Sequence, residues 1–309
     1  MRHGVVATGI QESRNVISAC NPQKGKKMKN KLSMMLTALT ALASGTAAHA
    51  DDLKKVTGLK TPESAVVAKD GKIYVSEIGE FGKDGDGQIS VIDTDGQLKV
   101  FATGMDDPKG LVFSGKTLYV ADKTRVLKVA ADGKWEVFAA ADAFPVAPQF
   151  LNDLEADGLG NIYVSDSGDL NGKGGAVYRI NKNGKVTTVT DSHNPLVLAP
   201  NGLLMGPRGT LLQVDFVSGT LYRINQSNGE MTKLADGFGG ADGLVRGKNG
   251  MLYVSDWKNG RVFSVDKSGK VTLLKDGFKA SADMTLSADG KFLLVPDMKA
   301  GELVWLPLH

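Results

Sequence analysis

The sequence predicts an all-β protein, a six-bladed β-propeller made by a single domain. An apolar segment that ends in an acidic residue occurs six times, and successive acids lie between 41 and 49 residues apart. Gly-containing turns separate these segments from further β-branched runs. A repeat of this length and composition is typical of one four-stranded blade. The final acids of the copies, called closing acids below, are Glu77, Asp122, Asp166, Asp215, Asp256 and Asp297.

The fifth copy contains a recognisable pattern for all four strands of a blade. Strands are predicted over 243–245, 251–255, 261–266 and 270–274. The turns between them include Asn259-Gly260 and Ser268-Gly269. Such pairs between apolar runs mark hairpins, because the turn needs a positive φ angle.

The last copy has only three predicted strands before the chain ends, over 284–286, 292–295 and 302–306. Residues 53–56 resemble the outer strands of the other blades. We therefore expect this N-terminal segment to pair with the last blade as its fourth strand. Without it the blade would present a bare edge.

The first fifty residues have the pattern of a secretory signal rather than of a blade. Five lysines between positions 24 and 31 precede an apolar run over 32–43, and Ala48-His49-Ala50 is a small-x-small cleavage site. The apolar run is too short to span a membrane. We expect an exported protein, periplasmic or secreted, whose propeller domain covers residues 51–309. Met28 is an alternative initiator.

The composition of residues 51–309 limits the classes of partner. Residues 1–50 carry seven of the 37 basic residues and one of the 34 acidic residues, which leaves 30 and 33. A net charge of −3 gives no reason to expect nucleic-acid binding. Cys20 is the only cysteine and lies before the apolar run, so the exported part has no thiol. We expect a small-molecule ligand and no membrane span, and the oligomeric state stays open.

A second regularity concerns the residue about 14 positions before each closing acid. It stands where the outer strand of one blade leads into the inner strand of the next, and inner strands line the central channel of a propeller. We therefore expect these side chains to meet at one mouth of the channel. They are Glu63, Asn152, Asn201, Asp242 and Asp283, with Lys109 at the equivalent place 13 positions before its acid.

Three carboxylates around one axis need a cation or protons to compensate their charge. Oxygen ligands without His or Cys favour a hard divalent cation, Ca²⁺ first, with Mg²⁺, Mn²⁺ or Zn²⁺ as alternatives. A turn-only interpretation is also available, because Asn and Asp favour the turns that precede strands. It does not account for Glu63, so a metal site is the preferred interpretation.

Four segments of the chain resemble the metal-site segments of the senescence-marker-protein/gluconolactonase family of six-bladed propellers, and their order and spacing match. The resemblance implies one divalent cation, usually Ca²⁺, bound by Glu63, Asn152, Asn201 and Asp242. It also implies that Asp242 is the catalytic base or nucleophile. The blades are more loosely similar to NHL repeats, which implies only binding. The four segments are Pro62-Glu63, Leu151-Asn152-Asp153, Pro200-Asn201-Gly202-Leu203 and Ala241-Asp242-Gly243.

Two departures from the family pattern concern the substrate. Sugar-lactonase members carry an Arg two residues before the Asn of the third blade, where this chain has Phe150. Lys109 has no counterpart, and we expect it to stabilise a developing oxyanion or to hold an anionic substituent. Charge balance against Asp283 is the alternative role for Lys109. The metal site therefore transfers from the family better than the sugar substrate does.

The residues that we expect to contact substrate are Lys109, Phe150, His193 and Asp283. His193 lies in the long connection over 191–200, where a plain surface position is the simpler interpretation. The aromatic residues Phe144, Phe216 and Trp257 are further candidates for the lining of a pocket. The inserted loops around 84–87 and 169–175 are expected to wall its mouth.

Two hypotheses about function follow. In the first, the protein is a divalent-metal-dependent hydrolase of the lactonase or esterase type that acts on a small ester or lactone. The cation polarises the carbonyl, Asp242 acts as base or nucleophile, and Lys109 assists. In the second, the propeller is non-catalytic, holds a structural ion and binds a ligand or a protein.

Overall fold

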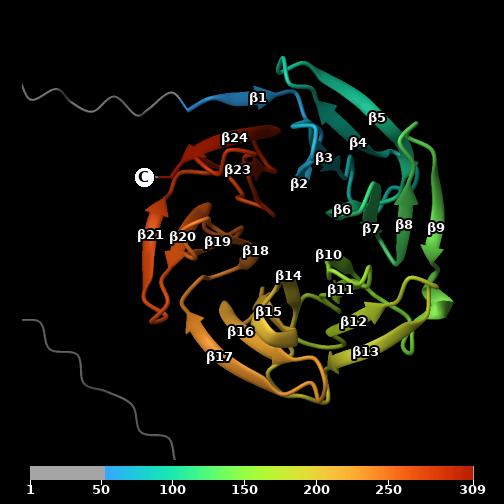
Figure 1. Ribbon diagram of the computed structural model, residues 1–309, viewed down its shortest axis with the longest axis vertical. Helices are drawn as coiled ribbons and strands as arrows, with labels where there is room; N and C mark the ends of the chain where they lie inside the picture. Colours follow the sequence, from blue (N-terminus) through green and yellow to red (C-terminus); the bar gives the residue numbers. More distant parts are fainter. Residues whose placement is uncertain (1–52, 309) are drawn as a thin grey trace, which may run out of the picture. The chain divides into compact units, whose positions relative to one another are not determined.

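The computed structural model describes residues 53–308, which form six four-stranded antiparallel sheets arranged in a ring (Figure 1). This arrangement confirms the predicted six-bladed propeller. The expected secretory signal, residues 1–50, lies outside the described residues. Within the part of the chain that is described, no helix has the length and apolar character needed to cross a bilayer.

The strands follow one another from the centre of the ring outward in each blade. The first three blades contain β2 (Pro62–Val67), β3 (Ile73–Glu77), β4 (Gly87–Ile92) and β5 (Leu98–Met105); β6 (Pro108–Ser114), β7 (Thr117–Asp122), β8 (Arg125–Val129) and β9 (Trp135–Ala139); β10 (Leu151–Ala156), β11 (Ile162–Asp166), β12 (Ala176–Ile180) and β13 (Val186–Asp191). The next two contain β14 (Pro200–Met205), β15 (Thr210–Asp215), β16 (Thr220–Asn225) and β17 (Met231–Asp236); β18 (Ala241–Arg246), β19 (Leu252–Asp256), β20 (Arg261–Val265) and β21 (Val271–Lys275). The last contains β22 (Thr285–Leu286), β23 (Phe292–Asp297), β24 (Glu302–Pro307) and β1 (Lys55–Thr57), and two short 3₁₀ turns occur at η1 (Ala141–Ala143) and η2 (Pro207–Gly209).

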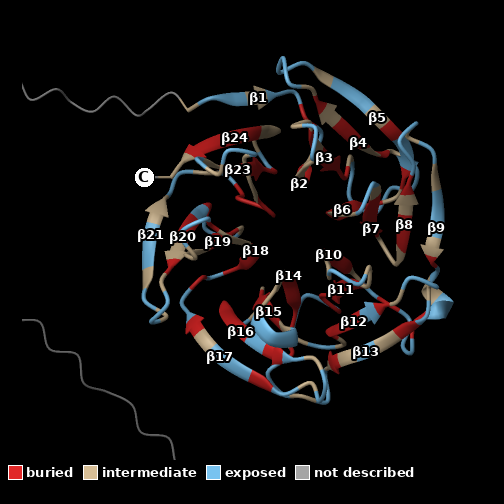
Figure 2. Ribbon diagram, in the orientation of Figure 1, coloured by how far each residue is buried: buried red, intermediate tan, exposed pale blue. Residues whose placement is uncertain are grey.

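The hydrophobic core lies between neighbouring blades. Tyr119 and Ala121 of the second blade share one buried cluster with Leu154 and Val164 of the third. Burial is concentrated on the inner and middle strands, whereas the outer strands β5, β9, β17 and β21 carry long exposed stretches (Figure 2). Each blade therefore buries both faces against its neighbours, and the ring is held by packing between blades.

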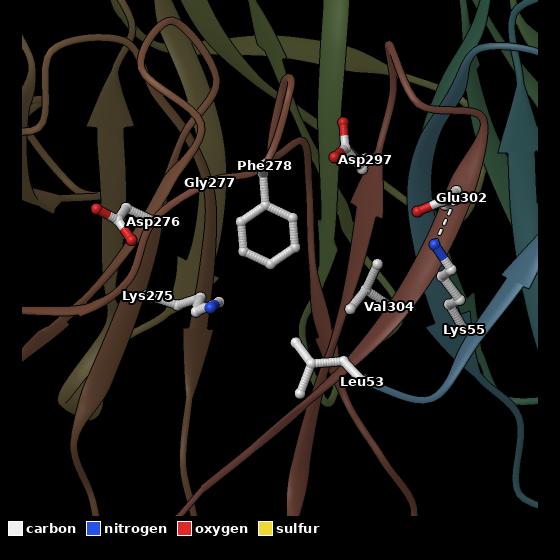
Figure 3. Close-up of a pocket in the computed structure, with 9 residues that line it drawn as sticks. All are labelled: Leu53, Lys55, Lys275, Asp276, Gly277, Phe278, Asp297, Glu302 and Val304. Atoms are coloured by element: carbon white, nitrogen blue, oxygen red, sulfur yellow. Dashed lines mark hydrogen bonds and ion pairs between the residues drawn. The ribbon is translucent and has the colours of Figure 1, made fainter. Parts of the chain in front are cut away.

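The N-terminal strand closes the last blade as predicted. β1 pairs antiparallel with β24, and the register places Val56 opposite Leu303. The Lys55 ammonium contacts the Glu302 carboxylate at 2.9 Å at this seam (Figure 3). The pairing is displaced by about two residues from the predicted segment 53–56. Leu53, Phe278 and Val304 lie around a hollow of about 250 Å³ beside the seam (Figure 3).

The closing acids tie each blade to the chain that leads into it. Every one of the six is buried and accepts backbone N–H groups from the segment before its inner strand. Asp166 Oδ1, for example, accepts from the N–H of Phe150 at 2.8 Å and from that of Gly168 at 3.0 Å. A carboxylate that satisfies such buried donors is costly to replace. This role explains why an acid ends every copy of the repeat.

A β-bulge occurs at the start of the inner strand in the first five blades. In the third blade Leu151 lies opposite Asp166, but Leu154 lies opposite Val164, so the register shifts by one residue between them. The same shift recurs in β2, β6, β14 and β18. Bulges re-aim side chains. The second residue of each of these strands lies within the bulge.

Candidate functional site

Five polar side chains from five different blades line one cavity of about 220 Å³ at a mouth of the central channel. Each is the second residue of its inner strand, within the bulge, and none is more than 4% exposed. The inner strands that carry them face the centre of the ring (Figure 1). The structure therefore brings together five of the six residues that the sequence places at this ring position: Glu63, Lys109, Asn152, Asn201 and Asp242.

Close approach of neighbouring inner strands brings these side chains within reach of one another. A Cβ on Gly202 would lie 2.3 Å from the carbonyl oxygen of Asp242, and a Cβ on Gly243 would lie 2.6 Å from Asp283 Oδ1. Only glycine fits at these two positions, each of which directly follows a cavity residue. The glycines keep the inner strands close at the axis and so keep the cavity small.

Four cavity residues each have one buried side-chain oxygen without a hydrogen-bond partner among the described residues. Such acceptors are rare in native proteins, and each costs about 1–3 kcal/mol when it is left unpaired. The described part of the chain contains seven buried side-chain atoms of this kind, and four of them meet in this one cavity. They are Glu63 Oε2, Asn152 Oδ1, Asn201 Oδ1 and Asp242 Oδ1.

Ser167 fixes the orientation of one of these groups. The Asn152 amide Nδ2 donates to Ser167 Oγ at 3.1 Å, and Ser167 Oγ donates to the Pro200 carbonyl at 2.7 Å. Because the nitrogen of the amide is held in this way, the oxygen is the atom that is left without a partner. Ser167 also links the third blade to the residue next to Asn201.

Burial dominates the electrostatics of the carboxylates. It raises the pKa of Glu63 well above the usual range, and the Asp242 and Asp283 carboxylates raise this pKa further while Lys109 opposes them. Burial and the Asp283 carboxylate likewise raise the pKa of Asp242. Without a compensating cation, the ionised forms of these two groups are therefore disfavoured. A divalent cation would reverse this preference.

The donor set fits a hard divalent cation. Two carboxylates and two amide oxygens are ligands that Ca²⁺ accepts. No group of three or more His, Cys, Asp or Glu side chains capable of holding a metal occurs among residues 53–308. A cation in this cavity would therefore depend on the amide oxygens of Asn152 and Asn201 as well as on the two carboxylates.

Lys109 is the cation of the cavity floor. Its Nζ donates to the Asp107 carbonyl at 3.0 Å and lies 4.2 Å from the centre of the Phe150 ring. Burial lowers the pKa of Lys109, while the Glu63 and Asp107 carboxylates raise it. No ion pair joins Lys109 to Asp283 among the described residues. No direct contact therefore supports the alternative in which Lys109 balances the charge of Asp283.

Asp283 and His193, two of the residues expected to contact substrate, are not among the residues that line the cavity, and His193 has the surface position that is its simpler interpretation. The Asp283 carboxylate accepts a hydrogen bond from Ser64 Oγ at 2.7 Å, and burial raises the pKa of Asp283 to about 7. His193 is almost fully exposed, and its Nδ1 contacts the Asp191 carboxylate at 2.8 Å. A turn at 191–194 directs the imidazole to solvent. Phe144 packs on Tyr178 in the core, so it is not a pocket residue.

Several cavity residues have a signal in the sequence that was not used for prediction. Ile78, Phe216, Trp257 and Met298 each directly follow a closing acid, and all four line the cavity. Ser167 occupies the same position in the third blade. Phe216, Trp257 and Phe150 were predicted to line a pocket, and they do so. The residue after the closing acid therefore forms part of the cavity wall in four of the six blades.

The sequence signature of the SMP-30/Gluconolactonase/LRE-like region matches residues 113–276, just over half of the chain. The chain belongs to this family. The matched region includes Asn152, Asn201 and Asp242, three of the four residues with unpartnered oxygens. Curated proteins give no match to the sequence.

Solved structures show the same fold at low sequence identity. A protein described as a "putative gluconolactonase" is 17% identical with a TM-score of 0.65, over 84% of this chain and 95% of the other. A catalytically inactive virginiamycin B lyase from Staphylococcus aureus, solved with quinupristin, is 15% identical with a TM-score of 0.59, over 83% and 99%. A streptogramin B lyase is also 15% identical with a TM-score of 0.59, over 82% and 97%. These likenesses establish the propeller architecture alone.

Proposed function

We propose that this protein is an exported hydrolase of lactones or esters that uses one divalent cation, Ca²⁺ first. The observation that carries the proposal is the meeting of four unpartnered oxygens from four blades in one cavity. Glu63, Asn152, Asn201 and Asp242 would hold the cation. Membership of a family whose description names gluconolactonase supports the reaction class. The pattern of residues 1–50 supports export to the periplasm or beyond the cell.

A bound divalent cation would supply Lewis acidity toward the carbonyl oxygen of the substrate. Asp242 then takes a proton from the attacking water or attacks the carbonyl itself, since Asp242 lines the cavity and its Oδ1 has no hydrogen-bond partner among the described residues. Lys109 holds a positive charge at the floor and stabilises the negative charge that develops on the substrate. The buried floor limits the access of bulk water to these groups.

A second candidate is a non-catalytic propeller in which the same residues hold a structural ion. Phe150 favours it, because an aromatic ring stands where sugar-lactonase members have an Arg. A screen of lactones and aryl esters separates the two functions. We expect turnover by the protein that begins at residue 51 and loss of turnover with chelator. Metal uptake without turnover of any compound would support the binding propeller.

Removal of the cation should destabilise the propeller. A ligand that binds only the folded state stabilises it by about 2.7 kcal/mol at a hundredfold excess over Kd. For a domain of this size we expect the Tm to rise by about 5–10 °C in Ca²⁺ relative to chelator. Calorimetric melts and elemental analysis provide the measurement. Superimposable melting curves together with a metal-free protein would support the turn-only interpretation.

Ser167→Ala should weaken the binding of the cation although Ser167 is not a ligand. Loss of the hydroxyl frees the Asn152 amide to rotate, and substitutions of this supporting kind typically cost about 10- to 100-fold in metal affinity. Calorimetric titration with Ca²⁺ measures the change. Ser264→Ala, on an outer part of the fifth blade, is the matched control and should bind as the parent does. Equal affinities of Ser167→Ala and the parent would remove Ser167 from the metal site.

A further inference from the structure

The walls of the cavity differ in chemistry from its floor. The five polar residues of the lining all come from the inner strands, whereas the other seven are apolar or aromatic and come from loops at the mouth. Four of these seven directly follow a closing acid: Ile78, Phe216, Trp257 and Met298. The reacting groups are thus confined to the bottom of an apolar cup.

One side of the cup is a continuous apolar surface that crosses four blades. The Trp257 and Phe216 rings lie 6.1 Å apart, and Trp257 Nε1 faces Met298 Sδ at 3.3 Å. Met298 and Ile78 belong to one buried cluster against which Trp257 packs. Because the single polar atom of this wall already has a partner, a hydroxyl placed against it would lose hydration without gaining a hydrogen bond. The wall therefore offers no hydrogen-bond partner to the hydroxyl groups of a polyhydroxylated compound.

The opposite side of the cup is also apolar. Phe150 covers Lys109 there, and Phe81 and Leu170 stand at the mouth with 53% and 36% of their surface exposed. These two side chains extend the apolar lining of the cavity to its mouth. The volume of about 220 Å³ is below the roughly 300–1,000 Å³ of most ligand pockets. It accommodates one ring or a short branched chain.

Two lysines that do not themselves line the cavity stack on rings of the aromatic wall. Lys258 Nζ lies 4.4 Å from the Phe216 ring centre, and Lys299 Nζ lies 4.1 Å from that of Trp257. Lys83 and Lys123, in loops on the other side of the ring, are paired with acids. No ion pair connects Lys258 or Lys299 to a carboxylate within residues 53–308. Stacking holds both ammonium groups against the rings, and the Lys258 ammonium also donates to the Phe216 carbonyl at 3.3 Å.

We propose that the cavity takes apolar esters or lactones with an aromatic or branched body and a negative charge at the end that faces the mouth. The proposal rests on the proposed function for the reacting carbonyl, which lies at the floor. The body packs against Phe216 and Trp257, and the anionic group lies between Lys258 and Lys299. Sugar lactones are excluded by the apolar wall.

Ligand binding without turnover tests this substrate class. The probes are 4-phenylbutyrate, the uncharged 4-phenylbutyramide and gluconate, each titrated into Ca²⁺-loaded protein. Trp257 in the wall provides a fluorescence signal, and calorimetry gives the affinity. We expect 4-phenylbutyrate to bind about 5- to 10-fold more tightly than the amide, as expected for two partly exposed charge contacts. Gluconate should not bind. Gluconate binding as tight as phenylbutyrate binding, or equal affinity for acid and amide, overturns the proposal.

Variants separate the wall from the lysines. The double variant Lys258→Gln/Lys299→Gln should remove the preference for the acid over the amide, whereas Leu170→Asn, on the side of the cup that holds neither lysine, should weaken both ligands and leave their ratio unchanged. Lys182→Gln, in a loop on the opposite face of the ring, is the control and should bind as the parent does. An unchanged preference in the double variant would show that the carboxylate binds elsewhere. Turnover of a neutral ester without these binding preferences would support the hydrolase function and contradict the proposed substrate class.

The predicted binding preferences without turnover of any ester would support the proposed ligand class and contradict the hydrolase function.

Discussion

Asp242→Asn should reduce turnover by about 10²–10⁴-fold, the range expected when a general base is lost. The substitution keeps an oxygen in the cavity, so we expect Ca²⁺ to remain bound with weaker affinity. The expected result is therefore a protein that contains metal and does not turn over substrate. Steady-state kinetics with the best lactone or ester, combined with elemental analysis, measures both properties on the same sample.

Asp289→Asn is the matched control for this substitution. Asp289 is an exposed acid in a turn between β22 and β23, on the face away from the cavity, so the same change there should leave both metal and kcat unaltered. If Asp242→Asn retained the turnover of the parent, the carboxylate would not be the base. If the variant lost its metal together with its activity, Asp242 would act as a ligand only.

Deletion of residues 51–58 should open the ring. It removes β1 and leaves β24 with unpaired backbone groups along residues whose apolar side chains are buried in the intact blade, among them Leu303 and Trp305. Loss of the ladder hydrogen bonds and of the Val56 packing costs about 3 kcal/mol or more. This corresponds to a fall in Tm of about 6–12 °C. The exposed edge should also promote association between chains.

Melting curves and light scattering compare this deletion with the protein that begins at residue 51. That protein keeps β1 and should remain a well-folded reference. A shortened chain with the Tm and the mass of the reference would show that β1 is dispensable for closure. Since the five polar residues of the cavity lie on inner strands that remain, any loss of Ca²⁺ affinity in the shortened chain would report the opening of the ring itself.

The fold could be predicted because its signal is local and repeated. The second, third and fourth strands of the fifth blade lie within one residue of their predicted positions at every boundary. The inner strand begins two residues before its predicted start: it was predicted over 243–245 but covers Ala241–Arg246. Its first residues form a bulge that contains Asp242 and Gly243, and an acid followed by glycine does not have the composition of a strand. The bulge that places Asp242 in the cavity is therefore also the reason why the sequence does not predict the first residues of the strand.

The convergence of the cavity residues was predictable for the same reason, since their register relative to the closing acid is fixed within each blade. Asp283 shows where local spacing fails. In the last blade the N–H of Asp283 donates to the Glu63 carbonyl of the first blade, and β22 is only two residues long. That contact joins residues 220 positions apart and depends on ring closure. The sequence near Asp283 therefore does not predict it. The direction of the His193 side chain could not be predicted from the sequence either, because it depends on the turn at 191–194.

The repeat assigns the floor and the wall of the cavity to different positions. Polar floor groups occupy the second position of the inner strand in five blades, and wall groups directly follow the closing acid in four of the six blades. The closing acid beside each wall position anchors the backbone whatever side chain follows it. Substitutions at 78, 216, 257 and 298 therefore change the wall and leave the polar residues of the floor in place. The shape of this cavity and the polar groups at its bottom can vary independently.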